Sequence, residues 1–259
     1  HLAGFSFQPA EFAKFALVLY LAHFLTKKAE VIGDVKAIFL PLCIVLGVSL
    51  LLIVKQPDLG TSVLVMAVAI SLIFAAGARK RHLFGLTALF MTTVAGLVYL
   101  VDYRWQRIVI FMDPWKDPKG VGYQTIQSLC AIGNGGLFGM GLGQGIQKRG
   151  YLPEAHTDFI FSVIGEELGL IGALCVLALF GVFIWRGFKI SRQSKDPFAC
   201  YLALGITCLI GFQALINIGV ALGALPTKGL PLPFVSFGGS SLIMSAVAAG
   251  ILLNISQYT

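Results

Sequence analysis

Residues 157–185 have the sequence TDFIFSVIGEELGLIGALCVLALFGVFIW, and this stretch decides the class of fold. A helix needs about 20 mainly apolar residues to cross roughly 30 Å of hydrocarbon. The stretch exceeds that length, and its charged residues, Asp158, Glu166 and Glu167, all lie near its start. It therefore predicts a long membrane-spanning helix.

The composition of the whole chain supports the same class. Of its 259 residues, 57% are hydrophobic and 12% are charged, whereas a soluble domain carries about 25% charged residues. So few charges cannot cover a soluble globule, and the apolar content excludes a disordered chain. The five cysteines lie mostly in apolar runs without a CxxC pair, which is typical of small buried residues. The sequence predicts an all-α polytopic membrane protein.

The length rule for a membrane helix marks several further apolar stretches along the chain. Charged residues or Gly and Pro turn residues bound each of them. We expect about seven transmembrane helices, at residues 9–26, 37–54, 60–77, 83–101, 157–185, 199–223 and 238–255.

The charged residues between these spans predict the orientation. The short loops at residues 26–36, 77–82 and 186–197 are rich in Lys and Arg, whereas those at 55–59 and 224–237 hold one lysine each. Positive loops stay on the cytoplasmic side of a membrane. The net charge of +7 is therefore explained by orientation, and we expect no nucleic-acid partner.

This orientation places residues 102–156 outside the cytoplasm as one large extracytoplasmic loop. A structureless connection longer than about 15 residues is uncommon unless it is functional, so we expect amphipathic or re-entrant segments that dip partly into the outer leaflet. Its glycine-dense tract, residues 133–150, has no GxxxxGK[ST] motif and no Rossmann context. We expect that tract to pack flexibly against lipid or a neighbouring helix.

Asp158 is the first candidate for chemistry. A carboxylate at a membrane edge is costly unless it is paired or faces water, so it indicates a functional site. The structural alternative is a helix terminus, where Thr157 or Asp158 acts as the N-cap and an acid favours the helix dipole.

Two other pairs of charges favour structural roles. Glu166 and Glu167 follow Asp158 by about two helical turns, and we expect a buried polar pair that bonds neighbouring helices. Glu11 and Lys14 are three residues apart, which lets them pair on one helix face.

Lys228 lies in residues 225–233, LPTKGLPLP, a loop stiffened by three prolines. An isolated lysine in an outer loop is usually solvated, but a rigid loop would let it bind an anion such as pyrophosphate. His156 has no partner ligands at metal spacing, so we expect no protein metal site. The residues leave room for a divalent cation, Mg²⁺ or Mn²⁺, shared with a substrate pyrophosphate.

Taken together, four segments resemble the SEDS family (shape, elongation, division and sporulation proteins). They are FQPAEFAK at 7–14, KQPDLGT at 55–61, YLPEAHTDFIFSVIGEE at 151–167 and LPTKGLPLPFVSFGGSS at 225–241. They follow the family's order and are spread over the whole chain. The PTKG form of the last segment is most similar to the FtsW division branch or its sporulation relative.

The resemblance implies a fold of about ten transmembrane helices, so residues 1–259 would be a single SEDS membrane domain that lacks its first helices. It also implies an activity. Family members polymerise lipid II into peptidoglycan strands on the outer face of the bacterial cytoplasmic membrane, and the division branch acts at the septum. The implied partners are a class B penicillin-binding protein, docking beside residues 157–185 and 199–223, and other divisome proteins.

The resemblance further places the family's catalytic carboxylate on Asp158 and its PTKG lysine on Lys228. Transfer of a sugar from an α-linked lipid pyrophosphate to a β-1,4 bond needs a base for the acceptor hydroxyl and cations for the leaving group. We predict Asp158 as the base and expect no tightly bound cofactor. The predicted substrate-binding residues are Lys228, Arg104, Arg107, Glu154, His156, Thr157 and Ser240, and the predicted structural polar residues are Gln8, Glu11, Lys14, Glu166 and Glu167.

Two alternatives remain open from the sequence. The chain could be a lipid II flippase, which needs polar groups running through the bilayer, or a non-catalytic scaffold for a class B penicillin-binding protein. Charges within the spans are few, and the candidate chemical groups gather on the outer side. This distribution favours an enzyme that acts outside the membrane.

Overall fold

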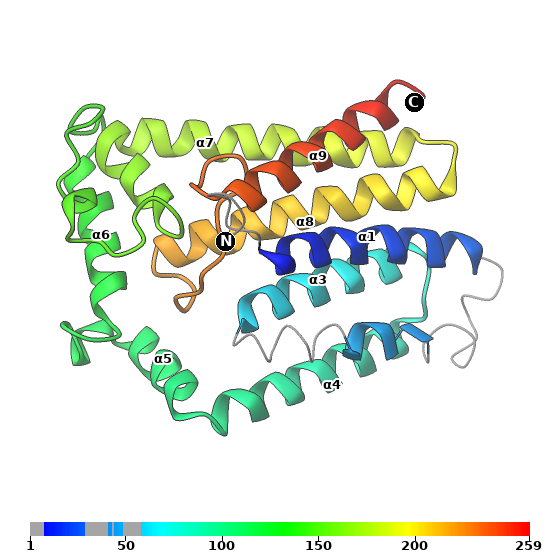
Figure 1. The fold of residues 1–259 in the computed structure, drawn as a ribbon, viewed down its shortest axis with the longest axis horizontal. Helices are drawn as coiled ribbons and strands as arrows, with labels where there is room; N and C mark the ends of the chain where they lie inside the picture. The colour runs from blue at the N-terminus through cyan, green and yellow to red at the C-terminus, as the bar shows by residue number, and fades with distance from the viewer. Residues whose placement is uncertain (1–7, 29–40, 43, 49–57) are drawn as a thin grey trace. The chain divides into compact units, whose positions relative to one another are not determined.

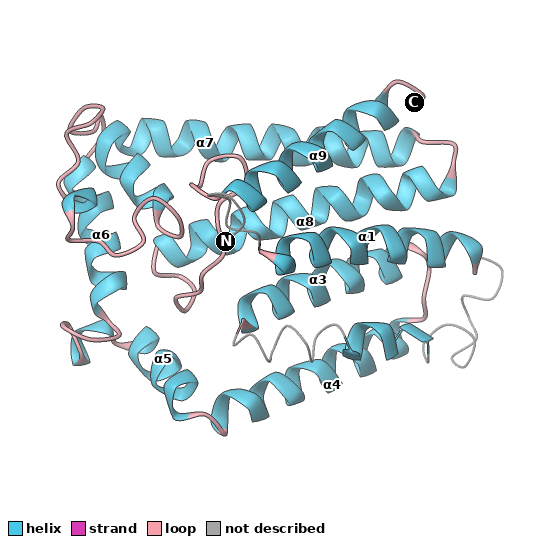
Figure 2. Cartoon of the chain, viewed as in Figure 1, coloured by secondary structure: helices cyan, strands magenta, loops and turns pink. Residues whose placement is uncertain are grey.

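The computed structural model describes residues 8–28, 41–42, 44–48 and 58–259. Within these ranges the chain forms helices joined by loops and turns, without a strand (Figures 1 and 2). The prediction of an all-α fold is confirmed. The helices are α1 (Pro9–Lys27), α3 (Leu59–Ala75), α4 (Lys80–Tyr99), α5 (Asp102–Met112), η3 (Pro114–Lys116), α6 (Tyr123–Gly135), η4 (Gln147–Arg149), α7 (Ile160–Gln193), α8 (Pro197–Ala221) and α9 (Gly239–Ser256).

Several of these helices have the length and composition of membrane spans. In the described part of the chain, α4, α7, α8 and α9 are long and apolar enough to cross a bilayer, and α3 is a shorter apolar helix. α1 has 19 residues, with Glu11 and Lys14 buried near its start. Six of the predicted spans thus coincide with helices, while most of the span predicted at 37–54 lies outside the described residues.

The bounds of α7 differ from the span predicted at 157–185. The helix begins at Ile160, so the residue before it is Phe159, and the expectation that Thr157 or Asp158 is the N-cap is wrong. It also continues to Gln193, through residues expected in a cytoplasmic loop. The extension carries Arg186, Lys189 and Arg192, and cations near the C-terminal end of a helix interact favourably with its dipole.

The chain divides into two compact units. Unit 1 comprises His1–Val94, Phe183–Phe212 and Gly239–Thr259, and unit 2 comprises Ala95–Val182 and Gln213–Gly238. The divisions fall inside α4, α7 and α8, so these helices contribute residues to both units. That residues 1–259 form a single SEDS domain stays a prediction.

Unit 1 is held together by close apolar packing of helices. α1 contacts both α3 and α9. On α8, a Cβ added to Gly205 would lie 2.6 Å from Val18 Cγ1 of α1 and 3.2 Å from Leu72 Cδ1 of α3. The absence of a side chain at Gly205 therefore lets these helices approach closely. The side chains buried around this junction include Leu21, Ala22, Leu64, Leu72, Ala203 and Ile206.

Unit 2 contains the segment predicted as a large outer loop. Its helices α5 and α6 give regular structure to residues 102–156, while immersion of this segment in the outer leaflet stays a prediction. The buried Ser128 of α6 donates from its hydroxyl to the Ala221 carbonyl (2.7 Å) and lies 2.6 Å from Ser162 Oγ. These bonds tie α6 to α7 and to the end of α8.

α7 is interrupted at Gly169, whose φ of 69° and ψ of −166° are not helical. This conformation is essentially restricted to glycine. The break leaves backbone carbonyls before it and amides after it without helical partners. An unpaired backbone group in hydrocarbon costs several kcal/mol, on the order of a lost hydrogen bond in an apolar medium. The partners must therefore come from another segment.

The glycine-dense tract supplies these partners. The N–H groups of two of its residues donate to carbonyls before the break, and two of its carbonyls accept from amides after it. Its backbone therefore completes α7, in place of the flexible packing expected from the sequence. The bonds are Met140 N to Glu166 O (3.0 Å), Gly141 N to Glu167 O (3.0 Å), Leu170 N to Gly136 O (2.9 Å) and Ile171 N to Leu137 O (3.3 Å).

Candidate functional site

Asp158 lies in a tight turn directly before α7. The backbone carbonyl of Glu154 accepts hydrogen bonds from the amides of Thr157 (3.2 Å), Asp158 (3.1 Å) and Phe159 (3.2 Å). Glu154 itself has a φ of 53°, a left-handed conformation that is uncommon for a residue with a side chain and occurs often at functional turns. The half-buried carboxylate of Asp158 is thus carried on a well-fixed backbone.

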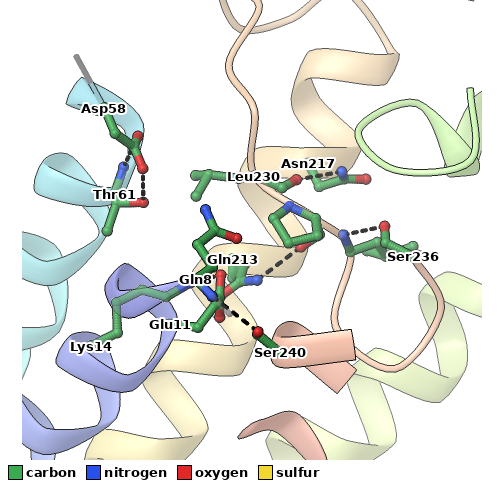
Figure 3. A network of polar contacts seen from close by, with 12 residues as sticks. Gln8, Glu11, Lys14, Asp58, Thr61, Gln213, Asn217, Leu230, Ser236 and Ser240 are labelled. Carbon is green, nitrogen blue, oxygen red and sulfur yellow. Dashed lines mark hydrogen bonds and ion pairs between the residues drawn. The ribbon is translucent and has the colours of Figure 1, made fainter. Parts of the chain in front are cut away.

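Asn217 joins this turn to the loop that follows α8. Its amide nitrogen donates to the Asp158 carbonyl (2.8 Å) and to the Leu230 carbonyl (2.7 Å), as Figure 3 shows for the second bond. The side chain is almost completely buried, at 1% exposure. One amide group therefore fixes the backbone of Asp158 to a residue two positions from Lys228.

Ser236 and Phe237 make a second junction between the same two segments. The Ser236 hydroxyl donates to the Thr157 carbonyl and accepts from the Leu232 amide (2.7 Å), which Figure 3 shows. The Phe237 amide donates to the His156 carbonyl (2.9 Å). We call residues 154–158 and 225–237, with Asn217, the outer loop cluster.

The Asp158 carboxylate lies close to the loop that carries Lys228. A Cβ added to Gly229 would lie 3.1 Å from Asp158 Oδ2. The carboxylate therefore lies against the backbone of the residue after Lys228, and a glycine there makes room for it. A half-buried lysine and a half-buried carboxylate are held in adjoining segments of one cluster.

Arg107 brings a second cation to this loop from α5. Its Nη1 donates to the Thr227 carbonyl (3.1 Å), and its guanidinium lies 4.5 Å from the centre of the Tyr103 ring. The Nε atom is buried and has no hydrogen-bond partner among the described residues. The positive charge of the guanidinium thus lies beside the loop, where it can attract an approaching anion.

Two other predicted substrate-binding residues, Arg104 and Ser240, make hydrogen bonds within their own units. Arg104 donates to the Leu97 carbonyl (3.3 Å) within its own segment, and its contact with a substrate stays a prediction. Ser240 belongs to unit 1, where its hydroxyl accepts from the Gln8 amide (3.1 Å; Figure 3). Also in unit 1, Lys14 Nζ contacts Glu11 Oε1 at 2.7 Å, and both side chains are buried.

Glu166 and Glu167 are buried but bind a loop rather than neighbouring helices. The reason is the break in α7, which brings the loop backbone against the helix. Glu166 accepts from the amides of Ile146 and Gln147, and Glu167 accepts from those of Gly143 and Gly145, at distances of 3.0–3.3 Å. Glu167 also forms an ion pair with Lys148. Both carboxylates therefore anchor residues 143–148.

Sequence reasoning missed the side chains that hold the outer loop cluster together. Asn217 and Gln213 are four residues apart on α8, and Gln213 Nε2 donates to the Pro231 carbonyl (2.8 Å; Figure 3). Two amide side chains on one face of an otherwise apolar helix were the available signal, because residues four apart share a helix face. Ser236 carried no such signal, since serine is ordinary in a loop.

The described residues contain no group of three or more His, Cys, Asp or Glu side chains that could hold a metal ion. A divalent cation would therefore need ligands from a substrate, and its participation stays a prediction.

Comparison with protein families shows which family the chain belongs to. The family model for FtsW, RodA and SpoVE, described as cell cycle protein, matches residues 1–259. The chain belongs to this family. Probable peptidoglycan glycosyltransferase FtsW of Geobacter metallireducens is 49% identical over 253 residues, covering 98% of this chain and 68% of that protein. Stage V sporulation protein E of Bacillus subtilis is 46% identical over 258 residues, covering 100% of this chain and 70% of that protein.

Solved structures support membership of the FtsW/RodA/SpoVE family. A chain from a peptidoglycan synthase complex that coordinates polymerization and crosslinking has a TM-score of 0.79 and 32% identity, covering 99% of this chain and 72% of that chain. The rod shape determining protein RodA of Thermus thermophilus has a TM-score of 0.66 and 33% identity, covering 99% and 68% respectively. The chain is a multi-pass membrane protein with the fold of this family.

Proposed function

We propose that this family member is a peptidoglycan glycosyltransferase that polymerises lipid II on the outer face of the cytoplasmic membrane, with Asp158 as its general base. The activity named for its relatives supports the reaction class. The observation that carries the residue assignment is the Asn217 amide, which bonds the Asp158 and Leu230 carbonyls and so holds the carboxylate beside the Lys228 loop.

The proposed step is a single inverting displacement. The Asp158 carboxylate takes the proton of the acceptor sugar's 4-hydroxyl as that oxygen attacks the anomeric carbon of the donor. The bond from the anomeric carbon to the lipid pyrophosphate breaks, the pyrophosphate leaves with the electron pair, and the α-linked donor becomes a β-1,4 link. General-base assistance contributes about 10²–10⁴-fold to such a step.

Lys228 and Arg107 are placed to stabilise the charge that develops on the departing pyrophosphate. Both side chains are half-buried. Lys228 lies in the loop beside Asp158, and Arg107 donates to the Thr227 carbonyl of the same loop. Fixed cations in a partly desolvated site stabilise a developing anion more strongly than mobile ones in water. The two cations would also discriminate in favour of a pyrophosphate over a neutral leaving group.

The contacts of the charged residues within the helices support an enzyme over a flippase. Lys14 is paired with Glu11, and the Glu166 and Glu167 carboxylates are occupied by loop amides. Groups engaged in this way do not offer a polar path for a large head group.

We further propose a class B penicillin-binding protein as partner, with other divisome proteins at the septum. In the apolar 18-residue stretch of α7, only 6% of the residues are buried within the protein. The helix therefore leaves a long apolar surface for lipid or for a partner's membrane helix. The similarity to a chain of a peptidoglycan synthase complex supports a partner of this kind.

The decisive test uses the full-length protein, purified with its transpeptidase partner and supplied with labelled lipid II. We expect glycan ladders from the wild type and a loss of at least about 10²-fold in Asp158→Asn. The matched control is Asp113→Asn, because Asp113 is an acid on the same outer segment whose side chain is 45% exposed and whose Oδ2 lies 3.9 Å from Lys116 Nζ.

Three results would contradict the proposal in different ways. Ladders at wild-type rate from a folded Asp158→Asn protein would reject the base assignment. An equal loss in Asp113→Asn would assign the effect to the charge of the outer segment. An intact complex that forms no ladders at all would favour the flippase or scaffold alternatives.

A further inference from the structure

A cavity of about 530 Å³ lies in unit 1 between the end of α3, the end of α7 and the start of α8. It is outside the outer loop cluster and is not used by the proposed reaction. Its walls are mainly apolar, and two cations stand in its lining. Its lining includes Ala75, Phe188, Arg192, Lys195, Tyr201 and Leu204, together with two serines, a proline and a cysteine.

The charge of this cavity is positive. Arg192 and Lys195 are both exposed, and neither forms an ion pair within the described part of the chain. The neighbouring acid, Asp196, is used to cap α8, because its carboxylate accepts from the amides of Phe198 (3.3 Å) and Ala199 (3.0 Å). The two cations are therefore available to an anion that enters the cavity.

A nearby aromatic residue indicates the depth of the cavity in the membrane. Trp185 is 61% exposed on α7, and Lys189 Nζ lies 5.9 Å from its ring centre. Exposed tryptophans gather where hydrocarbon meets the head groups. Arg192 follows seven residues later, about 10 Å further along the helix axis, so the cationic lining lies at the level of the head groups.

The distribution of Lys and Arg between the spans places this end of α7 on the cytoplasmic side. Basic pockets between the cytoplasmic ends of membrane helices are suited to anionic lipid head groups. The cavity combines the needed parts, which are two cations at head-group depth and apolar walls that continue toward the hydrocarbon.

We propose that this cavity binds an anionic phospholipid of the cytoplasmic leaflet. Arg192 and Lys195 contact the phosphate oxygens, and an acyl chain lies along Phe188 and Leu204. An acidic peptide would satisfy the cations, but it would leave the apolar walls without a partner. The proposal does not depend on the reaction assigned to Asp158.

The test measures lipid retention by native mass spectrometry of the full-length protein titrated with phosphatidylglycerol or phosphatidylcholine. We expect phosphatidylglycerol to be retained preferentially, and Arg192→Gln/Lys195→Gln to weaken that retention by about tenfold or more. The matched control is Arg79→Gln/Lys80→Gln, which removes two exposed cations next to and at the start of α4. It should retain the lipid as the wild type does.

A second variant tests the cavity itself rather than its charge. Ala75→Phe places a ring in the lining without altering a cation, and we expect it to reduce phosphatidylglycerol retention. Wild-type retention in Ala75→Phe, or equal losses in the two charge-removal variants, would overturn the proposal.

Competition identifies the occupant. Displacement of phosphatidylglycerol by inorganic phosphate at equal concentration would overturn the lipid assignment in favour of a free anion. Equal retention of phosphatidylcholine would remove the requirement for net negative charge, and binding of a polyglutamate peptide with no lipid retention would assign the cavity to a protein partner. Each of these outcomes rejects an anionic lipid.

Discussion

The outer loop cluster of unit 2 and the Gly205 junction of unit 1 keep their parts in place by different forces. In the cluster, Asn217 and Ser236 fix loop backbones through directional hydrogen bonds. At Gly205, apolar helices touch without a polar contact being required. A directional bond is lost when its donor is removed, whereas an apolar contact can be restored by a complementary change of volume. Loops that carry chemistry need the first kind of contact, and helices in lipid can use the second.

The largest effect is expected at the break in α7. In Gly169→Ala the new Cβ would lie 2.4 Å from the Gly139 backbone nitrogen, in a conformation that alanine avoids. The crowded atoms belong to backbone, which cannot move aside easily. We therefore expect the free energy of unfolding to fall by more than about 4 kcal/mol and little folded protein to be obtained. Expression and thermal unfolding in detergent measure this.

The control for that substitution lies on the same helix. Gly181→Ala has nothing within 4 Å of its new Cβ, and alanine favours a helix by about 1 kcal/mol over glycine. We expect unchanged or slightly raised stability. Equal behaviour of the two alanine variants would show that Gly169 is not a required break.

The next largest loss of stability is expected at the buried ion pair of unit 1. Lys14→Met leaves the buried Glu11 carboxylate without its partner 2.7 Å away, which costs about 3 kcal/mol or more. The double variant Glu11→Gln/Lys14→Met should recover part of this loss. Thermal unfolding of Lys14→Met, Glu11→Gln and the double variant checks it, and a double variant whose loss of stability equals the sum of the two single losses would contradict the pairing.

A smaller change in stability, with a larger change in activity, is expected at Asn217. Asn217→Leu removes the hydrogen bonds to the Asp158 and Leu230 carbonyls, lowers the free energy of unfolding by about 2 kcal/mol and releases the Asp158 backbone from the Leu230 loop. We expect lipid II polymerisation to fall at least about tenfold through kcat, since a misplaced base loses much of its effect. Partner binding should remain.

The matched control is Asn254→Leu, which makes the same change at an exposed position on α9. It should leave both polymerisation and stability close to the wild type. Normal kcat in Asn217→Leu would show that the bridge between the two loops is not needed for catalysis.

The smallest effect tests whether apolar packing can be repaired. Gly205→Ala crowds Val18 and Leu72 and should lower the free energy of unfolding by about 1 kcal/mol. Adding Val18→Ala removes the nearest atoms, and the double variant should regain the wild-type unfolding temperature. A double variant less stable than Gly205→Ala would mean that this junction is as specific as the outer loop cluster.

The spans followed from the sequence because length and hydrophobicity alone determine which segments cross a bilayer. The break at Gly169 did not, since glycine is common in membrane helices and the compensating residues 136–141 lie in a different segment. The same break explains the misassigned partners of Glu166 and Glu167. Their burial was predictable from an apolar helix, but the loop that binds them was not.

The residues of the candidate site also differ in how far the sequence could predict them. Asp158 and Lys228 could be named from the sequence because each is a charge in an unusual setting, at a membrane edge or within a proline-rich loop. Asn217 had only the weaker signal of a second amide, Gln213, on the same helix face, because its role depends on two carbonyls from segments separated along the chain. Arg104 and Ser240 were named from residue type and neighbourhood; each makes a hydrogen bond in the structure, and their part in substrate binding stays a prediction.

The two sets of contacts in unit 2 differ in how soon a growing chain can make them. Glu166 binds the amide of Ile146, 20 residues upstream, so the broken helix finds its partners already synthesised. The turn that carries Asp158 must wait for Asn217, 59 residues later, and Ser236, 79 residues after Thr157. Local contacts form early and distant ones late. During synthesis the contacts at the helix break would therefore form first, and the turn that carries Asp158 would be fixed only after the loop that carries Ser236 had emerged.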